Sequence, residues 1–519
     1  MTLETIAPIV PSASSALGAM AILFLAAFFS SSAERGGWRP GRNRARHRPG
    51  AGPSRRAEAE QDAELARMRI NLLLAAVATA ALAVAASVAA VHFGSRSAPG
   101  SMFPMLGHDD LSLVSILIVG GAAALVIWLS TSRLTSIRVP YGEYYALVLL
   151  GLAGGFAALQ AENTMVLFLG LEVMGVSASV LIAVERGKEH GLEAAFKAFL
   201  SNVVAAGILL FGIFFLFGAT GHFEYAGLRG TLDPEQPIAL AGLALVFAGL
   251  AMKLALAPFH QWLPDVLEGS STSIGAYFSV CVVVTVVLSW LRFVLHALPE
   301  HGSLMAPAFA ALGVASIAIG NAMGLAQRNV KRMLGWLVVA QVGTWVLLFA
   351  VGGPGAYGAL LFYLLAYALV MVGSFGVLMT LKGGGREMER LEHFAGIAES
   401  RKGLAAIMTL FMLALAGAPG TVGFWARWRL VDALVAGGQL WLAVAALLGT
   451  VVSFYICMRV PVMMYMRESP EEQPTESSTT ELAVLLLCAG VILALGFWPD
   501  PVLPGGGMRL FEFLQLSAH

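Results

Sequence analysis

The chain has 519 residues, of which 58% are hydrophobic and only 12% charged, and its mean hydropathy is +0.78. This composition is typical of a protein with many membrane-spanning segments and excludes a soluble enzyme. Lysine plus arginine and aspartate plus glutamate each total 32, so the net charge indicates neither a nucleic-acid partner nor an acidic one. The three cysteines have no paired spacing, which argues against iron–sulfur, zinc and disulfide frameworks.

Apolar runs long enough to span a bilayer recur about fourteen times along the chain. Backbone polar groups in lipid must be hydrogen-bonded within the protein, so we expect helices and an all-α polytopic membrane fold. The loop after the first run, residues 33–68, is rich in arginine, and the positive-inside rule places it in the cytoplasm and the N-terminus outside. We interpret this loop as a solvated, partly disordered topology determinant; binding to anionic lipid or nucleic acid is the alternative.

The stretch from Ala239 to Leu267 is too long for one straight crossing, because about thirty residues at about 1.5 Å each overshoot a hydrocarbon core of roughly 30 Å. Pro258 lies inside this stretch and removes a backbone hydrogen bond, so we expect a broken helix near it. Lys253 precedes the break and His260 follows it. A cation in lipid costs on the order of 2.5–3.5 kcal/mol on insertion scales, so a mid-span lysine beside a helix break predicts a functional site.

A second over-long stretch, Leu404 to Leu434, contains Pro419 and, beyond it, Arg427. Two interrupted helices about 160 residues apart, each with a basic residue near its break, indicate a duplicated unit of about five helices. The loop count makes the two units start on opposite faces of the membrane, so we expect inverted repeats. The expected organisation is three N-terminal helices in residues 1–140, the first repeat in 141–300, the second repeat in 301–468, and a polar loop with the last helix in 469–519.

Glu172 is an acid well inside its apolar run. An intramembrane carboxylate usually faces the bundle interior and a cationic partner, which predicts a role in proton relay; the alternative is a protonated, unpaired core acid. Lys253 is the natural central relay, because burial disfavours its charged form and a nearby carboxylate restores it; the alternative is snorkelling to the headgroups. His260 titrates near physiological pH and would extend the relay, or it is a hydrogen-bonded structural residue beside the proline.

Two further basic residues are candidates for the same path. Lys197 lies about one turn into its helix from the cytoplasmic side, so a path role and snorkelling are both open. Arg427 lies beyond the second break, where it would steer or block a proton as an exit gate rather than carry one, since arginine stays protonated. Its alternative is an interfacial anchor with Trp425 and Trp428. The sequence has no phosphate-binding loop, nucleophile elbow or metal-ligand spacing.

Five motifs, in this order, resemble those of the antiporter-like membrane subunits of respiratory complex I, most closely of the N type, over residues 141–466. The motifs are Phe168–Glu172, Leu192–Lys197, Lys253–His260, Gln327–Arg332 and Leu415–Phe424. The N type is favoured because the chain ends soon after its last apolar run, without the long lateral helix of the L type. A basic Arg427, where the M type has an acid, also favours it.

The resemblance implies the helix plan and inverted repeats expected above, and a glutamate–lysine pair between the fifth and seventh helices, here Glu172 with Lys253. Lys197 and His260 fall on the family's polar axis. The resemblance also implies proton translocation powered by quinone reduction elsewhere, so quinone, FMN and iron–sulfur clusters are expected only in partner subunits. Expected partners are the M-type neighbour, the small K- and J-type subunits, the lateral helix of the L-type subunit, and the lipid of a bacterial inner membrane.

Two departures from the family pattern bear on function. The family's central lysine of the eighth helix would fall at Val283, with no replacement nearby, and its terminal lysine falls at Arg427. The path would then run through water and His260, be altered, or not conduct. Two alternatives therefore stay open beside a proton-translocating subunit: a cation/proton antiporter subunit of the multi-subunit Mrp kind, and a non-conducting scaffold of the membrane arm.

Overall fold

The computed structural model describes residues 9–35, 53–91, 105–107, 109–136, 141–184, 189–298, 302–383, 386–468 and 478–499. The elements of the first part are α2 (Val10–Arg35), α3 (Pro53–Val91), α4 (Asp110–Ser136), α5 (Tyr141–Leu159), α6 (Thr164–Ile182), α7 (Glu189–Thr220), α8 (Tyr225–Thr231), α9 (Pro237–Lys253), α10 (Trp262–Gly269), α11 (Thr272–Tyr277), the π-helix η2 (Phe278–Val282) and α12 (Val283–Ala297). The elements of the second part are η3 (Gly302–Met305), α13 (Ala306–Leu325), α14 (Val330–Val351), α15 (Gly353–Thr380), β1 (Lys382–Gly383), β2 (Arg386–Glu387), η4 (Leu391–Phe394), α16 (Ile397–Ser400), α17 (Lys402–Ala416), α18 (Val422–Ala436), α19 (Leu440–Met466) and α20 (Thr479–Phe497).

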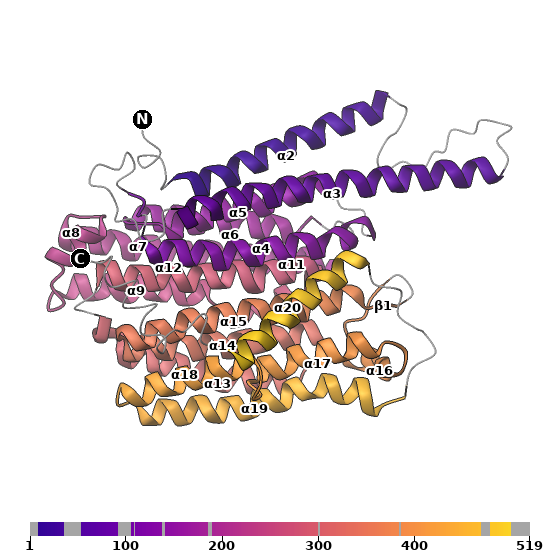
Figure 1. Cartoon of the computed structure of the whole chain (residues 1–519). Coiled ribbons are helices and arrows are strands. Elements are labelled where there is room, and N and C mark those ends of the chain that lie inside the picture. The colour runs from indigo at the N-terminus through magenta and orange to yellow at the C-terminus, as the bar shows by residue number, and fades with distance from the viewer. Residues whose placement is uncertain are drawn as a thin grey trace.

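The helices lie side by side in one bundle with roughly aligned axes (Figure 1). Helices α5 to α12 form one half and α13 to α19 the other, while α20 packs back onto α4 and α15. We call the end that carries α16 and the β1–β2 pair the basic end, because Lys382, Arg386, Arg390 and Lys402 lie in or next to these elements. The end that carries α8 is called the opposite end.

The expected all-α polytopic fold is confirmed. Among the described residues, eleven helices are long and apolar enough to cross a membrane, and three shorter apolar helices accompany them: Val10–Ala26, Pro237–Lys253 and Lys402–Ala416. The total of about fourteen crossings stays a prediction. Helices α14 and α15 are almost wholly buried, whereas only 33% of the residues in the spanning segments of α7 and α19 are buried, as expected where helices face lipid or partner subunits.

The prediction for the arginine-rich loop is wrong in its second half. Residues from Pro53 onward do not form a loop but extend α3. The physical reason is that this segment combines a proline at the first helical position with alanine, glutamate and arginine, which are strong helix formers. The N-terminal half of the loop lies outside the described residues.

The helix break near Pro258 begins directly after Lys253, where α9 ends. The next residues form turns rather than helix, and α10 starts at Trp262. The Met252 carbonyl near the end of α9 accepts hydrogen bonds from the Ala255 amide at 3.1 Å and from the Trp262 Nε1 at 3.2 Å, so α10 is tied back to the end of α9. The backbone N–H of Ala257 donates to Ser316 Oγ of α13 at 2.9 Å, which ties the break to the second half of the bundle.

The second break, near Pro419, separates α17 from α18. Gly417 ends α17 with a left-handed φ of 81°, a conformation that glycine adopts without steric cost. Its amide and the next one donate to the carbonyls of Ala414 and Leu413, which closes the end of the helix. Both long stretches are therefore interrupted in mid-bundle, as the prolines predicted.

We expect Gly417→Ala to lower the free energy of unfolding by about 1–2 kcal/mol, because a Cβ in the left-handed region is strained. A Cβ there would also collide with the Arg427 side chain. Unfolding by SDS titration of the purified chain in detergent micelles measures the loss. Gly403→Ala, in the same helix, is the matched control: a Cβ there meets no atom within 4 Å, so stability should stay equal or rise slightly. An equal loss of unfolding free energy in both variants would show that the left-handed backbone at Gly417 is not the cause.

Candidate functional site

Lys253 and Glu172 form an ion pair inside the first half of the bundle. The Lys253 Nζ donates hydrogen bonds to Glu172 Oε1 and to Asn202 Oδ1, both at 2.7 Å. The Asn202 Nδ2 donates to the second carboxylate oxygen of Glu172 at 3.2 Å. The three side chains come from α9, α6 and α7 and close a ring. The Lys253 side chain is only 4% exposed and that of Glu172 is 19% exposed, so each charge is compensated mainly by the other.

Local structure explains why the ring can form. Lys253 is the last residue of α9, so its positive charge lies at the negative end of the helix dipole. Gly175, one turn after Glu172, leaves space for the Asn202 side chain, with which a Cβ would overlap. The sequence analysis missed Asn202, although a carboxamide in an apolar run five residues after Lys197 is a polar signal of the kind that marks a buried contact.

A cavity of about 30 Å³ adjoins this ring. Its polar lining comes from Lys253, Asn202, Ser179 and Ser201, and the rest of its wall is apolar. This volume is enough for about one or two water molecules, and the polar groups supply their hydrogen bonds. The Lys253 ammonium therefore borders a space that is large and polar enough to hold water.

His260 follows the break on the way to α10. Its ring lies 5.6 Å from that of Trp336 on α14, and its buried Nδ1 has no hydrogen-bond partner among the described residues. An imidazole nitrogen can accept a proton, so His260 stays a candidate for the path beyond the break.

Lys197 lies in a different cluster, at the basic end. Its Nζ pairs with Glu193 at 2.8 Å and with Asp265 at 2.7 Å, and its side chain is 40% exposed. Asp265 also pairs with Arg332 of α14 at 2.9 Å, and Arg332 in turn reaches Glu268 at 3.1 Å. The structure therefore joins α7, α10 and α14 by an ion network at this end rather than placing Lys197 beside Lys253.

Arg427 is buried at the second break. Its Nη2 donates to the Leu415 carbonyl at 2.8 Å and its Nη1 to Thr450 Oγ1 at 2.7 Å. It thus satisfies a carbonyl near the end of α17 and links α18 to α19. Both helix breaks therefore carry a basic side chain, but only the one at Lys253 is paired with a carboxylate among the contacts the structure describes.

Val283 is the first residue of α12 after the π-helix η2, and it is fully buried. Its neighbours Val282 and Val286 line the cavity beside Lys253, so this wall is apolar. Towards the opposite end, Trp290 of α12 stacks on Phe247 of α9 with ring centroids 5.3 Å apart. This contact belongs to a larger group of packed aromatic rings, namely Phe247, Trp290, Phe293, Phe309 and Phe349, which we call the aromatic layer.

The opposite end holds a second buried ion cluster, which the sequence analysis missed. Arg292 of α12 donates from Nη1 to Asp109 Oδ1 at 2.8 Å, from Nη2 to Glu162, and from Nε to the Ala161 carbonyl at 2.7 Å. Burial alone would raise the pKa of Asp109, but the charges of Arg292 and His296 hold that pKa well below its usual range, and they lower the pKa of Glu162 in the same way. Both carboxylates are therefore ionised at neutral pH.

Asp109, Glu162 and His296 bring potential metal-binding atoms within 4.8 Å of one another. The guanidinium of Arg292 already bridges both carboxylates, so the protein itself supplies the cation at this cluster. In the sequence, the only signal for Arg292 is that it is one of the few basic residues on the side opposite the arginine-rich loop. Its carboxylate partners, Asp109 and Glu162, lie more than 100 residues away in the chain, so the sequence does not connect them.

Residues 161–453 match a family described as NADH:quinone oxidoreductase/Mrp antiporter, TM. The NADH-quinone oxidoreductase subunit N of Alkalilimnicola ehrlichii is 32% identical over 402 residues, which cover 76% of this chain and 82% of that protein. A chain of respiratory complex I from Thermus thermophilus is 28% identical with a TM-score of 0.72, over 86% of this chain and 98% of that one. A chain of the Mrp complex from Dietzia sp. has a TM-score of 0.80 over 100% of this chain and 99% of that one, but at 20% identity it shows the fold alone.

Two mid-bundle helix breaks with a basic residue at each define an antiporter-like membrane protein. The chain belongs to the NADH:quinone oxidoreductase/Mrp antiporter membrane-subunit family. The resemblance carried by the five sequence motifs is thereby confirmed. The ring of Glu172, Lys253 and Asn202 lies within the matched region, and so does Arg427.

We expect Lys253→Met to lower the free energy of unfolding by about 3 kcal/mol, because it leaves the Glu172 carboxylate buried without its partner. The double variant Lys253→Met/Glu172→Gln should recover most of that loss, since it removes both charges and keeps both shapes. SDS titration of the wild type, both single variants and the double variant gives the coupling energy. A double variant as unstable as the single one would show that the two side chains do not stabilise each other.

Proposed function

We propose that this chain is a proton-translocating membrane-arm subunit of a NADH:quinone oxidoreductase of the complex I type, and that Lys253 is the residue that stores the proton. One observation carries the proposal: a buried lysine–glutamate pair at a helix break, beside a cavity that fits about one or two waters. The subunit N of Alkalilimnicola ehrlichii aligns with this chain over 82% of its own length. This similarity supports a complex I subunit, and not merely a protein that shares the fold.

The ring suggests how the proton is held and released. While Glu172 accepts from Nζ, the Lys253 ammonium is compensated and keeps its proton. If Glu172 turned away, the ammonium would remain in an apolar pocket, where an unpaired charge is unfavourable, and its proton would pass to water in the adjoining cavity. Glu172 is the partner free to move, because it is more exposed than Lys253. Asn202 bonds both groups and keeps them in register.

The remaining candidates take supporting roles in this proposal. His260, with its unpaired Nδ1, receives the proton beyond the break. Lys197 and its ion network hold α7, α10 and α14 together at the basic end, which we place in the cytoplasm, with the N-terminus outside, in a bacterial inner membrane. Arg427 excludes free protons at the second break.

The chain is proposed to hold no cofactor of its own. Quinone, FMN and iron–sulfur clusters belong to partner subunits, and the neighbours are an M-type subunit, the small K- and J-type subunits and the lateral helix of an L-type subunit. The broad apolar surfaces of α7 and α19 suit such neighbours and lipid. Proteins that co-purify with the chain test this: iron–sulfur and quinone-site subunits support it, and cation-antiporter subunits would favour the Mrp reading instead.

The double variant Lys253→Met/Glu172→Gln separates function from folding. We expect the complex that contains it to assemble and oxidise NADH while moving fewer protons per electron, because the storage site is gone. Proton uptake by inverted membrane vesicles, set against NADH oxidation, measures this ratio. Lys402→Met, at an exposed lysine, is the matched control and should keep the wild-type ratio. An unchanged ratio in the double variant would support the third reading, a non-conducting scaffold.

A further inference from the structure

The ion cluster at the opposite end joins three segments that are far apart in the sequence. Asp109 lies just before α4, Glu162 lies in the turn between α5 and α6, and Arg292 and His296 lie one turn apart on α12. Backbone bonds hold the first two segments together: the Gly107 amide donates to the Gln160 carbonyl at 2.6 Å, and the Glu162 amide donates to the Met105 carbonyl at 2.9 Å. The cluster therefore fastens the end of α12 to a fixed pair of loops.

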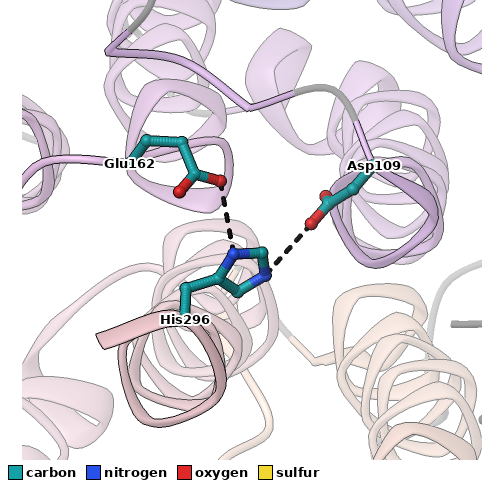
Figure 2. A group of neighbouring side chains, drawn as sticks. All are labelled: Asp109, Glu162 and His296. Carbon is teal, nitrogen blue, oxygen red and sulfur yellow. Dashed lines mark ion pairs between the residues drawn. The ribbon is translucent and has the colours of Figure 1, made fainter. Parts of the chain in front are cut away.

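The imidazole of His296 lies between the two carboxylates (Figure 2). Its Nε2 is 3.1 Å from Asp109 Oδ2, and its Nδ1 is 3.4 Å from Glu162 Oε1. A neutral imidazole has one N–H donor, whereas the doubly protonated ring has two. Carboxylates cannot donate when ionised, so two carboxylates facing both ring nitrogens fit the imidazolium.

Charge balance leads to the same state. Asp109 and Glu162 supply two negative charges, and Arg292 supplies one positive charge. With a neutral His296 the cluster carries a net negative charge in a largely buried place, and with the imidazolium it is neutral. Among the described residues, Tyr225 of α8 also lies beside the cluster; its buried hydroxyl has no hydrogen-bond partner there and stays neutral. Asp110, directly after Asp109, is buried at the first position of α4, where the helix dipole favours its negative charge.

We propose that His296 is a proton-binding site at the opposite end of the bundle, and that the bound proton locks α12 to the loops that carry Asp109 and Glu162. The site is reachable from water, because the side chains of His296 and Glu162 are 21% and 29% exposed. The ligand is a proton from the aqueous phase at that end. Loss of this proton leaves one ring nitrogen without a hydrogen to donate, so the lock weakens as the pH rises.

The lock also bears on the proposed proton path, and this part rests on the proposed function. Phe293, next to Arg292, packs on Phe247 with ring centroids 5.9 Å apart, and Trp290 stacks on the same ring. This aromatic layer, built from α9, α12, α13 and α14, lies between the Lys253 cavity and the ion cluster. A proton on His296 would therefore hold closed the apolar layer that separates Lys253 from the water at the opposite end.

Hydrogen exchange at the two loop segments tests the lock without turnover. The intact complex, or the full chain in lipid nanodiscs, is labelled across about pH 5.5 to 8.5, and exchange is corrected for its intrinsic pH dependence. We expect the protection of the Gly107 and Glu162 amides to fall by about tenfold as the pH rises, which corresponds to the loss of one charge-assisted hydrogen bond. Flat protection in the wild type would overturn the proposal.

Four variants make the assignment specific. His296→Gln should give low protection at every pH and His296→Lys high protection at every pH, because one can never be charged and the other keeps its charge. His222→Gln, an exposed histidine at the same end, and His108→Gln, next to Asp109 in the sequence, should keep the wild-type profile. A pH step that survives in His296→Gln, or vanishes in His108→Gln, would overturn the proposal.

A metal ion at the same cluster is tested with EDTA. Protection in the wild type that EDTA removes at every pH would also overturn the proposal, since the bound ligand would then be a metal ion. None of these outcomes changes the proton ratio expected for the Lys253 variants, so the two proposals fail separately.

Discussion

A charge buried in an apolar bundle must be compensated by groups in direct contact with it. In this protein several of these groups are backbone carbonyls at the ends of helices. Three of the buried cations that the structure describes bond backbone carbonyls, whereas Lys253 is compensated by the Glu172 carboxylate and the Asn202 carboxamide. Lys331 donates to the Ser270 carbonyl at 2.8 Å as well as to Glu389, and Arg292 and Arg427 bond the carbonyls of Ala161 and Leu415. A continuous helix has no free carbonyls to offer, so these three cations lie where the end of a helix supplies one, whereas Glu172, inside α6, depends on the side chains of Lys253 and Asn202.

The same constraint divides the first half of the bundle into three polar levels. The ion network of Lys197 and Arg332 lies at the basic end, the ring around Lys253 lies at the helix break, and the cluster of Arg292 lies at the opposite end. The aromatic layer separates the last two levels. Helix α12 lines the Lys253 cavity with Val286 and carries Arg292 towards its end, so a shift of this one helix would change both levels.

Features encoded locally could be predicted from the sequence. The prolines and glycines of the two over-long stretches predicted both breaks, and an acid and a lysine in apolar runs pointed to Glu172 and Lys253 as candidates. Contacts between distant segments could not be predicted. Asn202 looks like any polar residue in a span until α6 and α9 are placed beside it, and Arg292 meets Asp109 only because α4 begins at the level where α12 ends. The helical start of α3 could not be separated from a loop by its charge alone, because glutamate and arginine are common in solvated loops and also favour helix.

The absence of a lysine at Val283 changes what the interior between the two breaks can do. The polar groups that the structure describes there are neutral: the Tyr367 hydroxyl donates to the Ser279 carbonyl of the π-helix at 3.0 Å, and the Tyr363 hydroxyl donates to Gln341 Oε1 at 2.7 Å. Hydroxyl and amide groups orient water and pass a proton along, but they do not store one as lysine does. In a relay of the proposed kind, a proton that leaves Lys253 and passes His260 therefore meets no further basic side chain among these polar groups before the second break. Its transfer would have to be concerted with the movement of water, which makes the hydration of the cavity, rather than a second basic side chain, the step that controls the path.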